Sequence, residues 1–266
     1  MTTSSRDAIY VTSRDNPVVK DLRKLSQDST AYRKQGRVWL EGDHLCRAAL
    51  ARGLQPAIAV YAESGWRDAQ PDWVQAAGRN MVLADALMVE ISSLESPGRM
   101  GFVLDLPAAP ALQPLVASVI LDRVQDAGNV GSILRSAAAF GFGQVIALKG
   151  SAALWSPKVL RAGMGAHFAL RLVEGVDLDA LSVLGIPLVV TSSHDGQLLN
   201  RLLRDKALPM PCAWAMGHEG QGVHVSLMAQ AALKVRIDQP GGEESLNVAA
   251  AAAICLHASA LVASPA

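Results

Sequence analysis

The chain has 266 residues, half of them hydrophobic, and its 24 Lys or Arg balance 24 Asp or Glu, so the formal net charge is zero. This composition is typical of a globular protein with one large domain or two ordinary ones. Residues 1–20 lack the apolar core of a signal peptide, and the three cysteines are too widely spaced for a paired-cysteine motif. These features argue against export and predict free thiols in the cytoplasm.

Positive charge is concentrated at the start of the chain. Residues 1–40 carry eight Lys or Arg against four Asp, a net charge of plus four. Segment 16–27 places its valines and leucines on one helical stripe, which predicts a helix with a basic outer face. That face is either an ordinary solvated surface or one that contacts the phosphates of a nucleic acid. The side chains concerned are Lys20, Arg23, Lys24, Arg33, Lys34 and Arg37.

The remainder of the first half alternates short apolar runs with amphipathic segments. We expect strands at 38–40, 57–61, 81–83 and 100–106 and helices at 43–51 and 86–92. This alternation predicts a small α/β domain over residues 1–106. Three prolines in 107–114 disfavour both a helix and a central strand, so we place a linker there.

The second half repeats the alternation with stronger signals. We expect strands at 116–121, 144–148, 168–172, 187–191, 212–216 and 233–237, and helices at 130–140, 157–163, 178–184, 198–204 and from Ser245 onward. The pattern predicts a mainly parallel sheet covered by helices over residues 115–266. The last apolar stretch, 246–263, is interrupted by Asn247, His257 and Ser259. It therefore predicts a buried or interface helix and no membrane span.

Two strand exits in this half lead into glycine-rich loops. The run 212–216 breaks into a glycine loop, residues 217–222, with glycines at 217, 220 and 222. Glycines are unfavourable inside packed elements, so we expect something to approach this backbone closely. The run 233–237 also ends in a glycine break before 245–247 open the long helix. Loops at the carboxyl ends of parallel strands bind ligands, which predicts a pocket here.

A polar stretch follows the strand at 116–121. Asp122 ends that strand, and Asn129 lies at the start of the next helix, with Arg135 about 9 Å further along the helix axis. Because helical side chains tilt toward the amino terminus, Arg135 reaches back toward Asn129 and the free amides of the first turn. These groups either converge on an anion such as phosphate, or Arg135 pairs with Asp122 or Asp126.

Other common chemistries lack their motifs. There is no GxxxxGK[ST], and no GxGxxG lies between a strand and a helix, so neither phosphate loop is expected. The glycine loop contains His218 and lies between Cys212 and His224. These residues form neither an HExxH nor a paired-cysteine pattern, so we expect no metal site. Ser245 has no GxSxG setting, which leaves a hydrolase nucleophile unsupported.

Four ordered motifs carry a family resemblance. NVGSILRSAAAFGF, SPKVLRAGMGAHFAL, AMGHEGQGV and IDQPGGEESLNVAAAAAI resemble the successive motifs of the SpoU branch of the SPOUT methyltransferases. These enzymes methylate ribose 2′-hydroxyls of ribosomal or transfer RNA with S-adenosylmethionine. The first half is similar to the substrate-binding domain of members that usually act on ribosomal RNA. The resemblance implies a trefoil-knotted α/β methyltransferase domain, an RNA partner and a homodimer with the helix from Ser245 at its interface.

The resemblance also implies roles for individual residues. Backbone groups of the glycine loop and the two loops after it would hold the cofactor, at Gly217, Gly222, Ile237 and Leu246. The polar motif positions are Asn129, Arg135, Glu219, Ser245 and Asn247. A guanidinium with a pKa above about 12 is a poor proton acceptor, so we expect Arg135 to bind phosphate and stabilise the developing alkoxide. Glu219 or water would accept the proton, or Glu219 only braces the loop.

The chain departs from the family pattern at three places. Relatives commonly have proline directly after the isoleucine that Ile237 matches, whereas Asp238 and Gln239 precede the proline here. Gly163 stands where a hydroxyl residue is frequent, and His257 lies near a usual acidic position. Two alternatives to a ribosomal RNA methyltransferase are a transfer RNA ribose methyltransferase and a non-catalytic RNA-binding or ribosome-assembly protein of the same fold.

Overall fold

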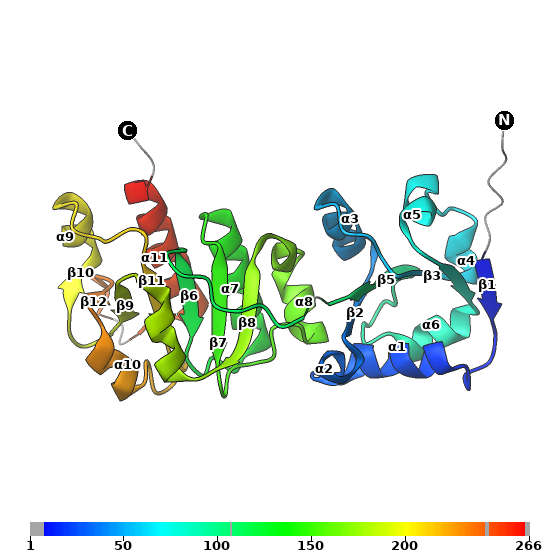
Figure 1. Cartoon of the computed structure of the whole chain (residues 1–266), viewed down its shortest axis with the longest axis horizontal. Coiled ribbons are helices and arrows are strands. Elements are labelled where there is room, and N and C mark those ends of the chain that lie inside the picture. The colour runs from blue at the N-terminus through cyan, green and yellow to red at the C-terminus, as the bar shows by residue number, and fades with distance from the viewer. Residues whose placement is uncertain (1–7, 107, 243–244, 264–266) are drawn as a thin grey trace. The chain divides into compact units, whose positions relative to one another are not determined.

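The structure is a computed structural model that describes residues 8–106, 108–242 and 245–263 (Figure 1). The chain forms two compact units: Met1–Ala108 with Trp155–Phe168, and Ala109–Leu154 with Ala169–Ala266. The sequence predicted domains at 1–106 and 115–266. It did not predict that Trp155–Phe168 groups with the first unit. Their assignment as a substrate-binding and a methyltransferase domain stays a prediction.

The first unit is an α/β unit built on a five-stranded mixed sheet of order β1-β4-β3-β5-β2. Strands β1 and β3 run parallel to β4, whereas β2 and β3 run antiparallel to β5. The elements are β1 (Ala8–Val11), α1 (Pro17–Gln27), α2 (Ala31–Gln35), β2 (Arg37–Glu41), α3 (Asp43–Ala51), β3 (Ile58–Ala62), α4 (Glu63–Trp66), α5 (Pro71–Ala76), β4 (Asn80–Leu83), α6 (Asp85–Ile91), β5 (Met100–Asp105) and α8 (Pro157–Gly163).

Helix α1 shows how local sequence determines an element in this unit. The Asn16 side chain caps its first turn by accepting a hydrogen bond from the amide of Val18 at 2.9 Å, and Pro17 occupies the first helical position. The stripe predicted from the sequence is confirmed, since Val19 and Leu22 are buried. Lys20 and Lys24 are exposed, and Arg23 is half-buried.

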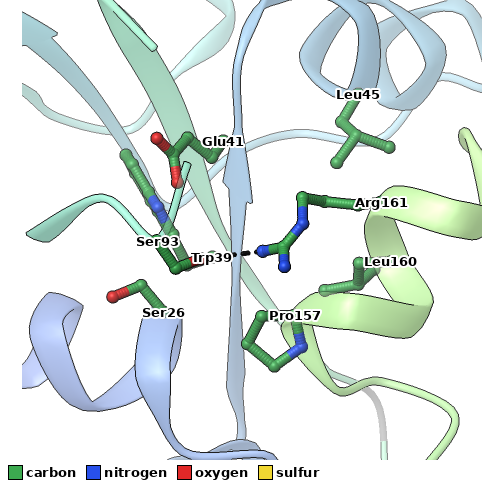
Figure 2. Close-up of a pocket in the computed structure, with 8 residues that line it drawn as sticks. All are labelled: Ser26, Trp39, Glu41, Leu45, Ser93, Pro157, Leu160 and Arg161. Atoms are coloured by element: carbon green, nitrogen blue, oxygen red, sulfur yellow. Dashed lines mark hydrogen bonds between the residues drawn. The ribbon is translucent and has the colours of Figure 1, made fainter. Parts of the chain in front are cut away.

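Where α8 packs in the first unit, the structure leaves a small cavity (Figure 2). Trp39, Glu41 and Leu160 border it, and Arg161 Nη1 donates to Ser93 Oγ at 2.8 Å across its edge. Its volume is about 10 Å³. That is the space of about one water molecule, so the cavity is too small for a nucleotide or cofactor.

The second unit is built on a seven-stranded sheet of order β10-β12-β9-β11-β6-β7-β8, in which every neighbouring pair is parallel (Figure 1). This confirms the mainly parallel sheet. The elements are β6 (Ser118–Leu121), α7 (Ala127–Ala139), β7 (Gln144–Leu148), β8 (Arg171–Val176), a 3₁₀ helix η2 (Leu178–Leu184), β9 (Leu188–Thr191), β10 (Gln197–Leu198), α9 (Leu199–Arg204), β11 (Ala213–Met216), α10 (Val225–Gln230), β12 (Leu233–Arg236) and α11 (Val248–Ala263).

Side chains of β11 alternate between two buried layers. Ala213 and Ala215 join an apolar cluster with Ile120 on one face of the sheet. Trp214 lies on the other face, fully buried, and its Nε1 donates to Ser259 Oγ of α11 at 2.9 Å. Helix α11 is therefore partly buried against the sheet. No helix in the described ranges is both long and apolar enough to cross a membrane.

Several element predictions were wrong in detail. The expected strand at 168–172 is a 3₁₀ turn (Ala166–Ala169) followed by β8, because Met164 and Gly165 turn the chain with φ of 47° and 89°. The segment 178–184 is a 3₁₀ helix and not an α-helix. Helix α11 begins at Val248 and not at Ser245. Helix α10 escaped notice because Leu227 is its one buried residue, which leaves no apolar stripe.

Candidate active site

The strand register brings the predicted loops to one edge of the sheet in the second unit. Strands β6 and β11 are neighbours, with Leu121 opposite Met216, so the segments that begin at Asp122 and Gly217 leave the sheet side by side. Strand β9 lies on the other side of β11 and pairs with β12. Chain order reverses between β6 and β11, and ligands of open α/β sheets bind at such switch points.

A cavity of about 550 Å³ opens at this edge. Its lining comes from the segments after β9, β11 and β12 and from the start of α11. The predicted cofactor positions Gly217, Gly222, Ile237 and Leu246 all line it, and so do the predicted polar residues Glu219, Ser245 and Asn247. The volume lies within the range of small-molecule sites, so the pocket suits a ligand of nucleoside size.

The glycine loop is folded tightly on itself. His218 and Gly222 exchange two backbone hydrogen bonds, of 3.0 and 2.8 Å, and Gly222 has φ of 67°. A Cβ on Gly217 would lie 2.2 Å from the carbonyl carbon of Gly222 and from the amide nitrogen of Val223. The expected close approach is confirmed, but the approaching atoms at Gly217 belong to the loop itself. At Gly217 it is therefore the chain's own backbone that leaves no room for a Cβ.

Three of the predicted polar residues form one hydrogen-bonded chain. Asn129 Nδ2 donates to Glu219 Oε1 at 3.2 Å, and Asn129 Oδ1 accepts from Asn247 Nδ2 at 3.0 Å. Asn247 Oδ1 in turn accepts from the amides of Ala249 and Ala250, at 2.9 and 3.2 Å, and so caps α11. The side chains come from three separate segments and meet beside the cavity.

Helix α7 places the remaining candidates. Asp126 caps it by accepting from the amide of Asn129 at 2.7 Å, so Asn129 lies in the first turn. Arg135 is exposed and forms no ion pair with any residue that the structure describes. The alternative pairing of Arg135 with Asp122 does not occur, because Asp122 pairs with Arg123 Nε at 3.0 Å. The Arg135 guanidinium is thus available for an anion.

Glu219 is a stabilised carboxylate. Partial burial raises its pKa, but hydrogen bonds from its own amide, from Asn129 Nδ2 and from the amide of Asp126 together outweigh burial and lower the pKa below its ordinary value. A carboxylate with a lowered pKa is a weaker proton acceptor than an ordinary glutamate. The arrangement favours Glu219 as a brace between the glycine loop and the start of α7.

The cavity also presents polar groups that the residues around it leave unsatisfied. Ser245 is exposed, and its hydroxyl makes no hydrogen bond to the described part of the chain. Gln239, one of the residues that interrupt the family pattern, holds a buried Oε1 that lacks a hydrogen-bond partner among the described residues. Both line the cavity. They fit a ligand that brings hydrogen-bond donors as well as apolar surface.

One residue of the site, Arg123, lies outside the sequence predictions. Arg123, the second residue after β6, donates from Nη1 to Gln221 Oε1 of the glycine loop at 2.9 Å. The one sequence signal for it is its position after a strand end. Within the described residues, no three His, Cys, Asp or Glu side chains gather as metal ligands would.

Comparison with known proteins places the chain in a family. Residues 117–257 match the model of the SpoU rRNA Methylase family. The chain is 30% identical over 261 residues to an uncharacterised tRNA/rRNA methyltransferase of Synechocystis sp., with 94% of this chain and 93% of that protein covered. It is 28% identical over 251 residues to the 23S rRNA (guanosine(2553)-2′-O)-methyltransferase RlmP of Bacillus subtilis, covering 93% and 97%.

A solved structure gives the same result for the fold. The AdoMet-bound rRNA methyltransferase from Sinorhizobium meliloti shares 27% sequence identity with the chain and superimposes with a TM-score of 0.79, covering 95% of this chain and 97% of that one. The family match spans β6 through most of α11, which includes every residue assigned above to the pocket. The chain therefore belongs to the SpoU rRNA methylase family.

Proposed function

We propose that this protein transfers a methyl group from S-adenosylmethionine to a ribose 2′-hydroxyl of ribosomal RNA. The observation that carries the proposal is one cavity lined by Gly217, Gly222, Ile237 and Leu246 and bordered by the Glu219–Asn129–Asn247 chain. The names of the Bacillus subtilis and Sinorhizobium meliloti relatives support the substrate class and the cofactor. The name of the Synechocystis relative includes transfer RNA, which is the second candidate substrate.

The residues present fit S-adenosylmethionine. Ile237 and Leu246 offer apolar walls, the glycine loop offers backbone groups, and Gln239 Oε1 offers an acceptor for an N–H or O–H group of the cofactor. When bound, the cofactor supplies an electrophilic methyl on a sulfonium, a reaction that requires no metal.

On the RNA side, we assign separate tasks to the polar residues. Arg135 binds a phosphate next to the target ribose and stabilises negative charge as it develops on the 2′-oxygen. Ser245 and Asn129 orient the hydroxyl toward the methyl group. Glu219 Oε1 already accepts hydrogen bonds from Asn129 Nδ2 and the amide of Asp126, so we assign this side chain to bracing the loop. The hydroxyl proton passes to a water molecule as the bond between the 2′-oxygen and the methyl carbon forms and the bond from that carbon to sulfur breaks.

The proposal extends to assembly, location and topology. Helix α11 leaves Ile254 41% and Leu261 60% exposed, and such apolar side chains on one helix support a homodimer interface. All three cysteines are free and buried, which suits a reducing cytoplasm. Family membership supports the trefoil knot in the second unit.

The test is ribose methylation in cells. Mass-spectrometric mapping of total RNA from cells with and without the gene should show one ribosomal 2′-O-methyl group that disappears on deletion. The intact gene should restore it, whereas Asn129→Ala should not, because this change breaks the Glu219–Asn129–Asn247 chain. A modification that is lost from transfer RNA instead would favour the second candidate, and unchanged methylation in both RNAs would refute the proposal.

A further inference from the structure

We propose that Arg123 is a positioning residue that holds the glycine loop in the conformation that binds the cofactor. The inference rests on the proposed function and concerns a residue that the family motifs do not single out. Arg123 reaches the loop through Nη1, which donates to Gln221 Oε1 at 2.9 Å, and Nη2, which lies 3.4 Å from the carbonyl oxygen of Gly222. Gln221 and Gly222 both line the cavity, whereas Arg123 does not.

Asp122 fixes the direction of the Arg123 side chain. Its buried carboxylate accepts from Arg123 Nε at 3.0 Å and from Nη2 at 3.3 Å. The same carboxylate accepts from the amide of His224, just beyond the loop, at 2.6 Å. Asp122 and Arg123 together therefore connect the end of β6 to both the tip and the far side of the glycine loop. Bidentate pairing of this kind defines orientation as well as distance.

The backbone at Arg123 adopts a conformation that residues other than glycine rarely use. Its φ is 59°, in the left-handed region. Its amide donates to Ser151 Oγ at 3.0 Å, and Ser151 Oγ donates to the carbonyl oxygen of Leu121 at 2.9 Å, which holds the turn. A strained conformation persists only where surrounding contacts over-determine it, and such positions concentrate at functional sites. Here the turn directs the guanidinium back toward the loop.

The glycine loop needs such support because of its composition. Three glycines in six residues give the unbound loop many backbone conformations, and ordering them costs entropy. Within the loop, the two hydrogen bonds between His218 and Gly222 restrain it locally, but they do not attach it to the sheet. Glu219 braces the loop against the start of α7, and Arg123 attaches its tip to the end of β6. Without Arg123, a smaller fraction of molecules holds the binding conformation, and the apparent affinity for cofactor falls by that fraction.

The experiment compares three variants of the full chain. Arg123→Ala removes the guanidinium, and Arg123→Gly removes it while relieving the backbone strain. Arg171→Ala is the matched control: Arg171 lies in the same unit and likewise bonds a glutamine side chain and a backbone carbonyl oxygen, those of Gln113 and Ala111, away from the cavity. The measurements are S-adenosylmethionine affinity by calorimetry, thermal unfolding, and hydrogen exchange at the amides of His218 and Gly222.

In both Arg123 variants, we expect the fraction of molecules with the loop in its binding conformation to fall to about one tenth. The dissociation constant for S-adenosylmethionine should then rise about tenfold. Exchange at His218 and Gly222 should rise in both, although Arg123→Gly should unfold at a higher temperature than Arg123→Ala. Arg171→Ala should leave affinity and loop exchange unchanged.

The inference is overturned if Arg123→Gly binds cofactor like the wild type, since strain and not the guanidinium would then matter. Unchanged loop exchange in both Arg123 variants also overturns it. If the wild-type protein itself does not bind S-adenosylmethionine, the proposed function fails, and the exchange measurement alone decides whether Arg123 holds the loop.

Discussion

Asn129 shows how one side chain couples two parts of the candidate site. Its amide donates to Glu219 and accepts from Asn247, and an asparagine is suited to this because its side chain offers both donor and acceptor atoms. The glycine loop, the start of α7 and the start of α11 therefore meet at a single residue. Arg135 lies further along α7 and stays outside this network.

Arg135→Ala should abolish methyl transfer and leave cofactor binding nearly intact, because Arg135 is exposed and does not line the cavity. Loss of an electrostatic stabiliser of this kind typically costs about 10²–10³ in rate. Single-turnover methylation and calorimetry with S-adenosylmethionine measure the two effects separately. Arg201→Ala, an exposed arginine of α9, is the control. Equal loss of cofactor affinity would contradict the assignment of Arg135 to the RNA side.

Glu219→Gln should retain methyl transfer to within about tenfold, since the amide oxygen can still accept the hydrogen bonds of Asn129 and Asp126. Hydrogen bonds outweigh burial and lower the pKa of Glu219 in the folded protein. The stability that the ionised Glu219 contributes is therefore present above its unfolded pKa. It is lost as the pH falls through the lower folded pKa. Glu219 therefore stays ionised near neutral pH. The pH–rate profiles of the wild type and the variant should be parallel. An acidic limb present in the wild type and absent from the variant would identify Glu219 as the base.

Among the helices, α1 has fewer unpaired cations for RNA phosphates than its sequence suggested. Lys20 pairs with Asp15 at 3.0 Å and Arg23 with Glu90 at 2.6 Å. Beyond α1, Arg37 pairs with Asp105 at 2.7 Å. Lys24 has no ion pair with any residue in the described ranges. A paired cation must first break its ion pair before it can contact a phosphate. We therefore expect fewer side chains of the basic segment to contact RNA phosphates than its sequence predicted.

Lys24→Ala should lower the salt dependence of RNA binding more than Arg23→Ala does. Each phosphate contact contributes about 0.9 to the slope of log K against log salt for a duplex and about 0.7 for a single strand. Binding titrations across a salt series with the full chain measure both slopes, and Arg23→Ala serves as the matched paired control. Identical slopes for the wild type and Lys24→Ala would exclude α1 from the RNA surface.

One segment, Trp155–Phe168, groups in the fold with residues that lie far from it in the sequence. It lies between β7 and β8 in the chain but belongs to the first unit. Within it, Val159 and Leu160 are buried. A fragment that starts at residue 109 therefore keeps this segment and loses the unit that buries it.

That fragment should unfold at a clearly lower temperature than the full chain, or aggregate, because exposing large buried side chains costs about 1.5–3 kcal/mol each. Thermal unfolding followed by circular dichroism compares the fragment with the full chain. Replacing Val159 and Leu160 by serine in the fragment should reduce aggregation, since it removes the exposed apolar surface. A fragment that unfolds cooperatively at the temperature of the full chain would show that residues 109–266 are an independent domain.

Sedimentation should give about twice the mass of one chain if α11 forms the dimer interface. Ile254→Glu combined with Leu261→Glu should produce monomers, because both apolar side chains are exposed on α11 and a charge there must be desolvated on association. Val183→Glu, an exposed apolar residue of η2 at 54%, is the control and should stay dimeric. A wild-type monomer at all concentrations would remove the dimer from the proposal.

Much of the fold could be predicted because its signals are local. The stripe of α1, the apolar runs of β6, β7 and β11 and the glycines after β11 were each recognised from neighbouring residues alone. The loops in which the family motifs placed the predicted cofactor residues are the ones that line the cavity, and the roles of these residues stay a prediction. Elements without a clear period, such as β1 with its exposed Ile9 and Tyr10, escaped prediction because propensity alone is a weak signal.

The class of fold, the family and part of the cavity lining, such as Gly217, Ile237 and Leu246, could be predicted from the chain alone, since they depend on short-range pattern and residue identity. Three-dimensional packing is what brings Asn129 to Glu219 and Asn247, which lie 90 and 118 residues away in the chain. It also decided that Arg123 turns toward the glycine loop and that Trp155–Phe168 groups with the first unit. Such contacts depend on strand order and register, which no local spacing encodes.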